Sequence, residues 1–453
     1  MRKPGTHLAV IVFALSVSPA IAKARALSLI DSAQHAPATS NTLPPPSTTG
    51  EAPPKRITAY TLPPERYQQA HQLGRTYFRY LLISFCYGLI VLWLILRLRI
   101  ASRYRSWAER VSPRRFVQAI VFAPLLLLTI AILELPTGIY RHWVNSTYGL
   151  SIQRWPSWFW DWTKAELITI IGGTLFIWLL YAVIRKSPRR WWLYFWLVSL
   201  PIALVLIFLA PLYLDPQFHQ FEPLATKDPA LTIALQNLAH RSGQDIPPER
   251  MFWMGAGEKT TTLNAYVTGF GASKRIVVWD TTIAKLSTPQ IAFVAGHEMG
   301  HYVLHHVAKG LALGAVGFLI ALYLGFRSIG WAISRWGPGW GVRGLDDWAC
   351  LPALLFLFSV MSFVSNPIAG AVSRYLEHQA DQYALEVTHG LTPDSGHVAA
   401  QAFQVMGNLG LSDPDPNPAY VFLFYDHPPI RDRVQFCLSY DPWAKGQQPE
   451  FVK

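Results

Sequence analysis

Charged side chains are scarce in this 453-residue chain. They make up 15% of it, whereas a soluble domain usually carries about a quarter. Hydrophobic residues make up 51%, and several apolar runs reach the roughly 20 residues that a helix needs to cross a bilayer. This balance excludes an ordinary soluble enzyme and predicts an integral, multi-pass membrane protein surrounded by a lipid bilayer.

Cysteine is also scarce, and basic residues outnumber acidic ones. The three cysteines, Cys86, Cys350 and Cys437, form no CxxC pair, so neither a cysteine zinc site nor a disulfide framework is indicated. Lys and Arg exceed Asp and Glu by 39 to 27, which gives a net charge of +12. No basic patch is interleaved with aromatic residues, so we attribute the basic excess to membrane topology and not to nucleic-acid binding.

The alternation of apolar and polar stretches divides the chain into six parts. A secretory leader, which is cleaved or kept as an anchor, is followed by a Pro-rich linker that approaches the membrane. Four membrane spans, a first polar region, two more spans and a second polar region come next. These parts are 1–22, 23–76, 77–210, 211–306, 307–370 and 371–453.

The six expected spans are each close to the length that a bilayer requires. Because the spans are apolar, the two polar regions must hold any chemistry. The spans cover about 78–97, 116–135, 165–184, 191–210, 307–326 and 349–369.

A five-residue motif, His297-Glu298-Met299-Gly300-His301, is the strongest chemical signal in the chain. Two histidines four residues apart lie one turn apart on the same face of a helix and can bind the same zinc ion. Glu298 then projects beside the metal, where it can hold a water molecule and take its proton. Thr288 as N-cap, Pro289 at the first position and the apolar residues after them predict this helix. We therefore predict one zinc ion per chain.

The residues before the motif predict a small sheet. An amphipathic helix is expected over 229–241, with Asp228 as its N-cap. Three strand-like runs follow it, with a turn joining the second run to the third. The runs are Met251–Met254, Asn264–Phe270 and Arg275–Trp279.

A catalytic zinc needs a third protein ligand beside an open position. Glu377 and Asp381 lie four residues apart on the helix that continues the sixth span. Glu377 can be the third ligand, and Asp381 can accept a hydrogen bond from the far nitrogen of a ligand histidine. The plain alternative is an ordinary charged helix face. His305 lies four residues after His301, but each four-residue step drifts about 40° around a helix and would place it off the His297–His301 bisector, so we predict that His305 and His306 are both helix-face histidines.

Several short segments of this sequence, taken in order, resemble those of the type I CAAX prenyl protease family of integral-membrane zinc peptidases, relatives of HtpX. The resemblance runs from about Thr61 to Arg433 and is densest before and around the metal motif. The matching segments are Thr61-Leu62-Pro63-Pro64-Glu65, Glu134-Leu135-Pro136, Asn264-Ala265-Tyr266-Val267-Thr268-Gly269, Lys274-Arg275-Ile276-Val277-Val278, the metal motif, Ser373-Arg374 through Glu377 to Asp381, and His427-Pro428-Pro429 with Arg433.

The resemblance implies a mainly α fold, in which a multi-pass helical bundle with a membrane chamber carries a gluzincin-type zinc peptidase domain with a small sheet. It implies that the strand at Asn264, Ala265 and Tyr266 pairs with the backbone of a polypeptide substrate. It implies zinc ligation by His297, His301 and Glu377, Glu298 as the base, His427 as a donor to the oxyanion, and Asp381 and Arg433 as supports of the ligand histidines. A packed loop histidine and a simple ion pair are the alternatives for His427 and Arg433.

Two basic segments predict the orientation. Residues 97–115 contain seven arginines, and the loop 185–190 between the third and fourth spans contains four basic residues. The positive-inside rule makes both segments cytoplasmic, and counting spans then puts 211–306 and the C-terminus outside. A bacterial inner or plasma membrane with an extracytoplasmic catalytic domain is therefore expected, and the leader agrees with it.

This orientation bears on the substrate. Family members that process prenylated proteins are understood to face the cytosol, so the resemblance does not carry the prenylated substrate over. We predict a zinc metalloendopeptidase that cleaves membrane-associated or exported polypeptides, with prenylated CAAX peptides as the alternative. An ion transporter and a zinc-stabilised scaffold are the non-enzyme alternatives; the clustering of acids and histidines beyond the spans, and Glu298, count against them. No oligomeric state is indicated.

Overall fold

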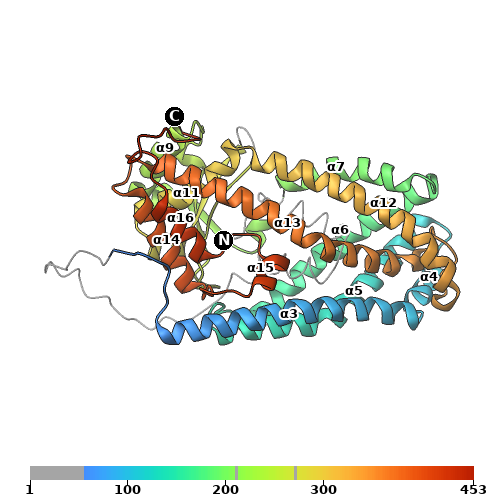
Figure 1. Ribbon diagram of the computed structural model, residues 1–453. Helices are drawn as coiled ribbons and strands as arrows, with labels where there is room; N and C mark the ends of the chain where they lie inside the picture. The colour runs from blue at the N-terminus through green and yellow to red at the C-terminus, as the bar shows by residue number, and fades with distance from the viewer. Residues whose placement is uncertain (1–55, 210–212, 270–272, 453) are drawn as a thin grey trace.

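The computed structural model describes residues 56–209, 213–269 and 273–452 of the chain (Figure 1). The predicted leader, most of the Pro-rich linker and part of the turn after the second predicted strand lie outside these residues. The described chain is mainly helical and contains one four-stranded sheet. The predicted fold class is confirmed.

Six long helices of the described residues run along the length of the molecule (Figure 1). Five of them are long and apolar enough to cross a membrane. The exception is α7, whose described apolar part, Trp191–Ile207, is about 26 Å long at 1.5 Å per residue and falls short of a bilayer core of about 30 Å. The fourth span therefore stays a prediction. The six helices are α3 (Pro64–Arg97), α5 (Arg115–Thr147), α6 (Trp155–Lys186), α7 (Trp191–Leu209), α12 (His306–Trp340) and α13 (Leu351–Thr388).

Two of these helices extend well beyond their predicted spans. The first turns of α3 precede residue 78 because Ala70 and Leu73 pack against Leu411 in the C-terminal part of the chain. Helix α13 passes through Pro367 without a break and continues to Thr388. A single rigid element thus connects the sixth span with the segment that carries Glu377.

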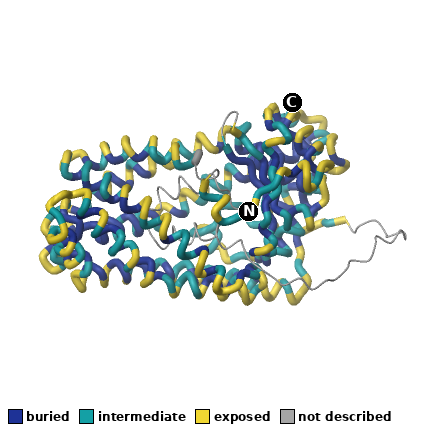
Figure 2. The backbone as a smooth tube through the Cα atoms, turned by 180° about the vertical axis from the view of Figure 1, so that it is seen from behind, coloured by how far each residue is buried: buried dark blue, intermediate teal, exposed yellow. Residues whose placement is uncertain are grey.

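The two ends of the molecule are built differently. One end is closed by α4 (Ile100–Val111) and η5 (Trp348–Cys350), which pack on a large apolar cluster between the spans. The other end holds the sheet and a second apolar cluster, and Figure 2 shows buried residues gathered most densely there. The helices at this end are α8 (Leu224–Lys227), α9 (Pro229–Arg241), α10 (Asp280–Lys285), α11 (Thr288–Val303), α14 (Ser395–Leu409), α15 (Pro418–Phe424) and α16 (Ile430–Ser439).

The sheet has the strand order β1-β2-β4-β3, so β3 lies at an edge. β2 pairs with β4 in parallel, and the other two pairs are antiparallel. The three predicted strands are present, with the second shorter than expected. β1 was not predicted, because four residues that end in proline give no recognisable alternation. The strands are β1 (Gln220–Pro223), β2 (Met251–Gly255), β3 (Ala265–Thr268) and β4 (Arg275–Trp279).

The helix starts follow capping chemistry. In α9, the side chain of Asp228 accepts a hydrogen bond from the backbone N–H of Leu231, which confirms the predicted cap. In α11, the prediction of Thr288 as N-cap is wrong by one residue. Ser287 is the cap, and it forms a reciprocal capping box with Gln290. Ser287 is the cap instead of Thr288 because only Ser287 has a glutamine three residues later.

Candidate metal centre

The helices α11 and α13 bring three buried ligand atoms together. Nε2 of His297 lies 3.2 Å from Nε2 of His301 and 3.1 Å from Oε2 of Glu377. Nε2 of His301 lies 3.5 Å from Oε1 of Glu377. Atoms that bind a tetrahedral zinc at 2.0–2.2 Å are about 3.3 Å apart, so both the spacing and the donor set fit that ion. Among the described residues, these three form a group that could hold a metal.

Two glycines of α11 make this convergence possible. A Cβ on Gly300 would lie 3.0 Å from the ring of Tyr383, and one on Gly296 would lie 3.1 Å from Val387. Both neighbours belong to α13. The missing side chains let the two helices approach closely enough for His297 and His301 to meet Glu377 across the interface.

Glu298 lies beside the ligand cluster and does not take part in it. Its Oε1 is 3.9 Å from Nε2 of His297, and its side chain is almost fully buried. A carboxylate at this distance from the ligand atom can contact a water molecule held at the open position of a metal. The neighbouring Tyr302 has a raised pKa through burial and the nearby Glu298 charge, so it stays neutral.

A buried relay supports His297 from the side opposite the metal position. Nδ1 of His297 donates to Oδ1 of Asp381 over 2.8 Å. Arg433, on α16, donates from Nε and Nη2 to both oxygens of the same carboxylate, over 2.7 and 2.5 Å. Burial lowers the pKa of His297, but the hydrogen-bonded Asp381 and Glu377 carboxylates outweigh it and raise the pKa.

His427 also reaches the centre. Its Nε2 lies 3.1 Å from Oε2 of Glu377, and its Nδ1 lies 2.9 Å from Oδ1 of Asp426. Burial lowers the pKa of His427, but the charges of Glu377 and Asp426 more than offset this and raise it. The packed loop histidine that we considered as an alternative does not account for a ring directed between two carboxylates.

His306 is a residue that sequence reasoning missed. We expected it on an outward helix face, but it is buried, with Nδ1 3.1 Å from Nδ1 of His301 and Nε2 3.2 Å from Oε1 of Gln379. The reason is a break: α11 ends at Val303, and His305 adopts φ 56° before α12 begins. A prediction that continues the helical period of α11 past this break therefore gives the wrong direction for the His306 side chain.

The tautomers of His301 and His306 follow from the choice of Nε2 as the metal-binding atom of His301. If His301 presents Nε2 to a metal, its Nδ1 carries the proton and donates to Nδ1 of His306. His306 is then neutral and donates from Nε2 to Gln379, whose own Nε2 donates to the Tyr375 hydroxyl over 3.3 Å. In this row of hydrogen bonds from His301 to Tyr375, each donor therefore meets an acceptor. His306 is thus placed to orient His301, as Asp381 is placed to orient His297.

The expected substrate strand is present at the edge of the sheet. Asn264 lies just before β3, and its backbone is already used: its N–H donates to Thr282 Oγ1, and its C=O accepts from Trp279 N–H. Because antiparallel pairing alternates, Tyr266 bonds with Val277, whereas Ala265 directs its N–H and C=O away from β4.

Comparisons with known proteins show the family of this chain. The model of peptidase family M48 matches residues 225–440, and the model described as CAAX prenyl protease N-terminal, five membrane helices, matches residues 47–220. The uncharacterized metalloprotease YhfN of Bacillus subtilis is 38% identical over 74% of this chain and 77% of its own. The chain belongs to peptidase family M48.

Other M48 relatives extend the similarity. CAAX prenyl protease 1 of Saccharomyces cerevisiae is 25% identical over 73% of this chain and 75% of its own. The crystal structure of S. mikatae Ste24p superimposes with a TM-score of 0.71 over 95% of this chain and 99% of that one, at 20% identity, which shows the shared fold. This M48 protein is an integral-membrane metalloprotease that acts on polypeptides. The ion-transporter and scaffold alternatives are not favoured.

Proposed function

We propose that this metalloprotease is a zinc endopeptidase whose single ion is held by His297, His301 and Glu377. The observation that carries the proposal is the approach of three buried ligand atoms, from two helices, to within 3.1–3.5 Å of one another. Two imidazoles and one carboxylate form a ligand set that catalytic zinc uses, with the fourth position left for water or substrate.

The residues around the metal ligands have separate roles in hydrolysis. Zinc, when bound, supplies a Lewis acid that lowers the pKa of a water molecule and polarises the scissile carbonyl. Glu298 holds that water, takes its proton and passes the proton to the leaving amine. His427 donates from Nε2 to the oxyanion, and its Nδ1 lies within hydrogen-bond distance of Asp426 Oδ1.

The buried partners keep the ligands in one orientation. Asp381 accepts the Nδ1 proton of His297, so the lone pair of that ring stays on Nε2, and Arg433 holds the carboxylate in place. Arg433 therefore acts through Asp381 as a positioning residue. We assign His306 the same role for His301.

The substrate backbone adds to the edge of β3 that is paired with no other described strand. Ala265 is the residue whose N–H and C=O face outward, so it is the pairing residue of the three that the resemblance suggested. The side chain of Asn264 lies at the start of this edge. The ring of Tyr266 is buried in the small cluster around Met254 and Trp279, so we assign Tyr266 to the support of the strand instead of to substrate contact.

We further propose that the metal centre faces the outside of a bacterial inner membrane. The arrangement in Figure 1 supports this, because α4 with its arginines lies at the end of the long helices opposite to the metal. By the positive-inside rule the α4 end is cytoplasmic. In this reading, 77–210 and 307–370 are the membrane part, and 211–306 with 371–453 form the peptidase domain.

Cysteine labelling tests the orientation. The exposed native Cys86 is replaced by serine, and a single cysteine is introduced as Asp245→Cys or, as the matched control, Arg103→Cys. A membrane-impermeant maleimide applied to intact cells should label Asp245→Cys and spare Arg103→Cys until the cells are lysed. The reverse pattern would overturn the orientation.

The substrate class follows from the orientation. Membrane-associated or exported polypeptides are accessible from that side. A prenylated substrate is indicated only by the names of the relatives that are called CAAX prenyl proteases. The discriminating assay compares an unmodified unfolded polypeptide with a farnesylated CAAX peptide. Faster turnover of the farnesylated peptide would favour the alternative.

The chemistry itself is tested by metal removal. A chelator should abolish cleavage of the unfolded polypeptide, and one equivalent of Zn²⁺ per chain should restore it. Purified protein that cleaves after its bound metal has been removed, as measured by elemental analysis, would contradict the proposal.

A further inference from the structure

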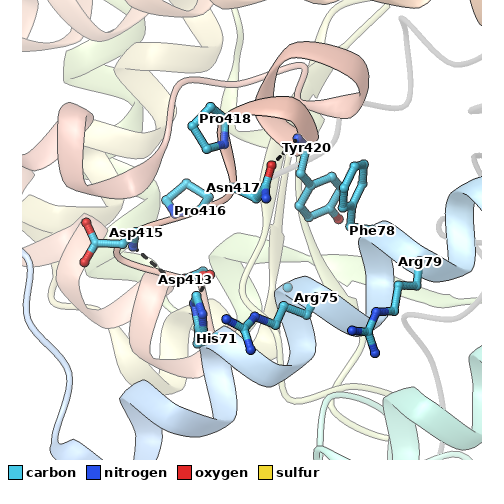
Figure 3. Close-up of a pocket in the computed structure, with 11 residues that line it drawn as sticks. His71, Arg75, Phe78, Arg79, Asp413, Asp415, Pro416, Asn417, Pro418 and Tyr420 are labelled. Carbon is cyan, nitrogen blue, oxygen red and sulfur yellow. Dashed lines mark hydrogen bonds and ion pairs between the residues drawn. The ribbon is translucent and has the colours of Figure 1, made fainter.

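A second pocket lies away from the metal centre, between α3 and the segment that leads into α15. Its volume is about 300 Å³. Figure 3 shows two arginines of α3 on one side of it and a proline-rich turn with Tyr420 on the other. The residues that matter for its chemistry are His71, Arg75, Arg79, Asp413 and Asp415.

The acidic groups of this pocket are already paired. Oδ2 of Asp413 lies 2.9 Å from Nδ1 of His71. Asp415 pairs with Arg431 and accepts a hydrogen bond of 3.2 Å from the Tyr67 hydroxyl. Both carboxylates thus already have partners within the fold and are directed to them.

The two arginines have no ionic partner among the residues that the structure describes. Arg75 and Arg79 are exposed, lie one turn apart, and make no ion pair or hydrogen bond with any residue that the structure describes. The pocket therefore offers two guanidinium groups, each able to bind two oxygens of one phosphate. An anionic ligand is the complementary occupant.

The position along α3 indicates where the ligand comes from. Arg75, Arg79 and Ile83 follow one another at four-residue spacing on the same helix face. Ile83 is 66% exposed, and Ile90 further along is 52% exposed, as expected for residues that contact lipid. At 1.5 Å per residue, Arg79 lies about 6 Å and Arg75 about 12 Å from Ile83, which is the depth of the headgroups.

Aromatic residues beside the pocket match that depth. The ring of Phe78 stacks on that of Tyr420 with centroids 5.4 Å apart, and Phe422 of the same short helix is 59% exposed. Aromatic side chains are enriched at the membrane interface, where part of the ring is wet and part contacts lipid.

We propose that this pocket binds the phosphate headgroup of an anionic phospholipid from the leaflet on the peptidase side of the membrane. Arg75 and Arg79 bind the phosphate oxygens, and the acyl chains run along the apolar face of α3 that begins at Ile83. The segment that forms the other wall continues through α15 to His427, so a bound headgroup holds in place the chain that carries His427.

Binding of soluble short-chain lipids to the full-length, zinc-loaded protein in detergent tests this proposal. The probes are dihexanoyl phosphatidylglycerol, dihexanoyl phosphatidylcholine and inorganic phosphate, each titrated separately. The test variant is Arg75→Gln/Arg79→Gln, and Arg75→Lys/Arg79→Lys keeps the charge. Arg327→Gln/Arg335→Gln, which removes two exposed arginines without described partners from α12, is the matched control.

The phosphatidylglycerol affinity should fall about 25-fold in the double Gln variant, on the order of fivefold for each arginine near a membrane surface. The Lys variant should lose less than the Gln variant, and the control should stay within about twofold of the wild type. Phosphatidylcholine should bind the wild type more weakly than phosphatidylglycerol does. Unchanged unfolding temperatures exclude misfolding.

Three results would overturn the lipid assignment. An equal loss in the α12 control would make the effect one of overall charge. Equal affinity for phosphatidylcholine would remove the role of the anionic headgroup. Inorganic phosphate that binds as tightly as phosphatidylglycerol, with the same loss in the Gln variant, would make the pocket a site for free anions.

Discussion

Two buried arginine–aspartate pairs lie at opposite ends of this molecule, and only one of them contacts a residue of the candidate metal centre. At the α4 end, Nη1 of Arg105 donates to Oδ2 of Asp347 over 2.6 Å. At the metal end, Arg433 binds Asp381 through two bonds of 2.7 and 2.5 Å. The type of charge, the burial and the distance are alike.

The difference lies in what else the aspartate binds. Asp347 accepts hydrogen bonds from the backbone N–H of Arg343 and Ala349, over 2.9 and 3.1 Å, and so fixes the turn before α13. Asp381 instead accepts from a ring nitrogen of His297. A buried pair by itself therefore says little about function, since such pairs roughly balance desolvation against attraction. The residue that the aspartate binds in addition to the arginine is what distinguishes the two pairs.

The largest effect is expected from a change at the metal end that leaves both pairs intact. Glu298→Gln removes the group that takes the proton from water, so turnover should fall about 10²- to 10⁴-fold. Zinc content and unfolding temperature should match the wild type, because no ligand and no buried pair is altered. Cleavage at the wild-type rate would refute the role of Glu298.

The two pairs can be compared directly with one matched substitution. Asp381→Asn and Asp347→Asn each remove the acidic group closest to a buried arginine, so each should cost about 3 kcal/mol or more of unfolding free energy. Only Asp381→Asn should also weaken zinc binding, by about 10- to 100-fold. Competition with a fluorescent zinc chelator measures this, and an equal loss of affinity in Asp347→Asn would erase the distinction.

The adjacent histidines give a smaller and more local test. His306→Leu removes the acceptor of the His301 Nδ1 proton and should weaken zinc binding about tenfold. His306→Asn, whose carbonyl oxygen can accept that proton, should recover most of the affinity. His305→Asn is the control, because asparagine tolerates the left-handed conformation at this position. Equal affinities in all three variants would remove His306 from the metal centre.

The smallest effect is expected at the edge of the sheet. Ala265→Pro deletes an N–H that points away from β4, so it should raise KM about fivefold while kcat stays unchanged. Tyr266→Phe, next to it, should leave KM as it is, because its hydroxyl faces Asp215 and Met254. If KM responds to the tyrosine and not to the proline, the substrate does not bind along β3 through Ala265.

Much of the fold was accessible from sequence because the signals are local. Long apolar runs predicted the helices α3, α5, α6, α12 and α13, and caps and alternation predicted α9 and three strands. The short β1 carries too little pattern to be recognised. The end of α11 was also out of reach, because the left-handed residue His305 lies between two helices that read as one.

The amino-acid sequence by itself determined the spacing of His297, Glu298 and His301, because residues within one helix have a fixed relation that helical geometry supplies. Only the tertiary structure decided which distant groups meet them. Glu377, Arg433 and His427 reach the centre from three separate segments, and Glu377 does so because two glycines of α11 let α13 pack closely against it. Long-range convergence depends on packing between elements, and no local pattern encodes its distances.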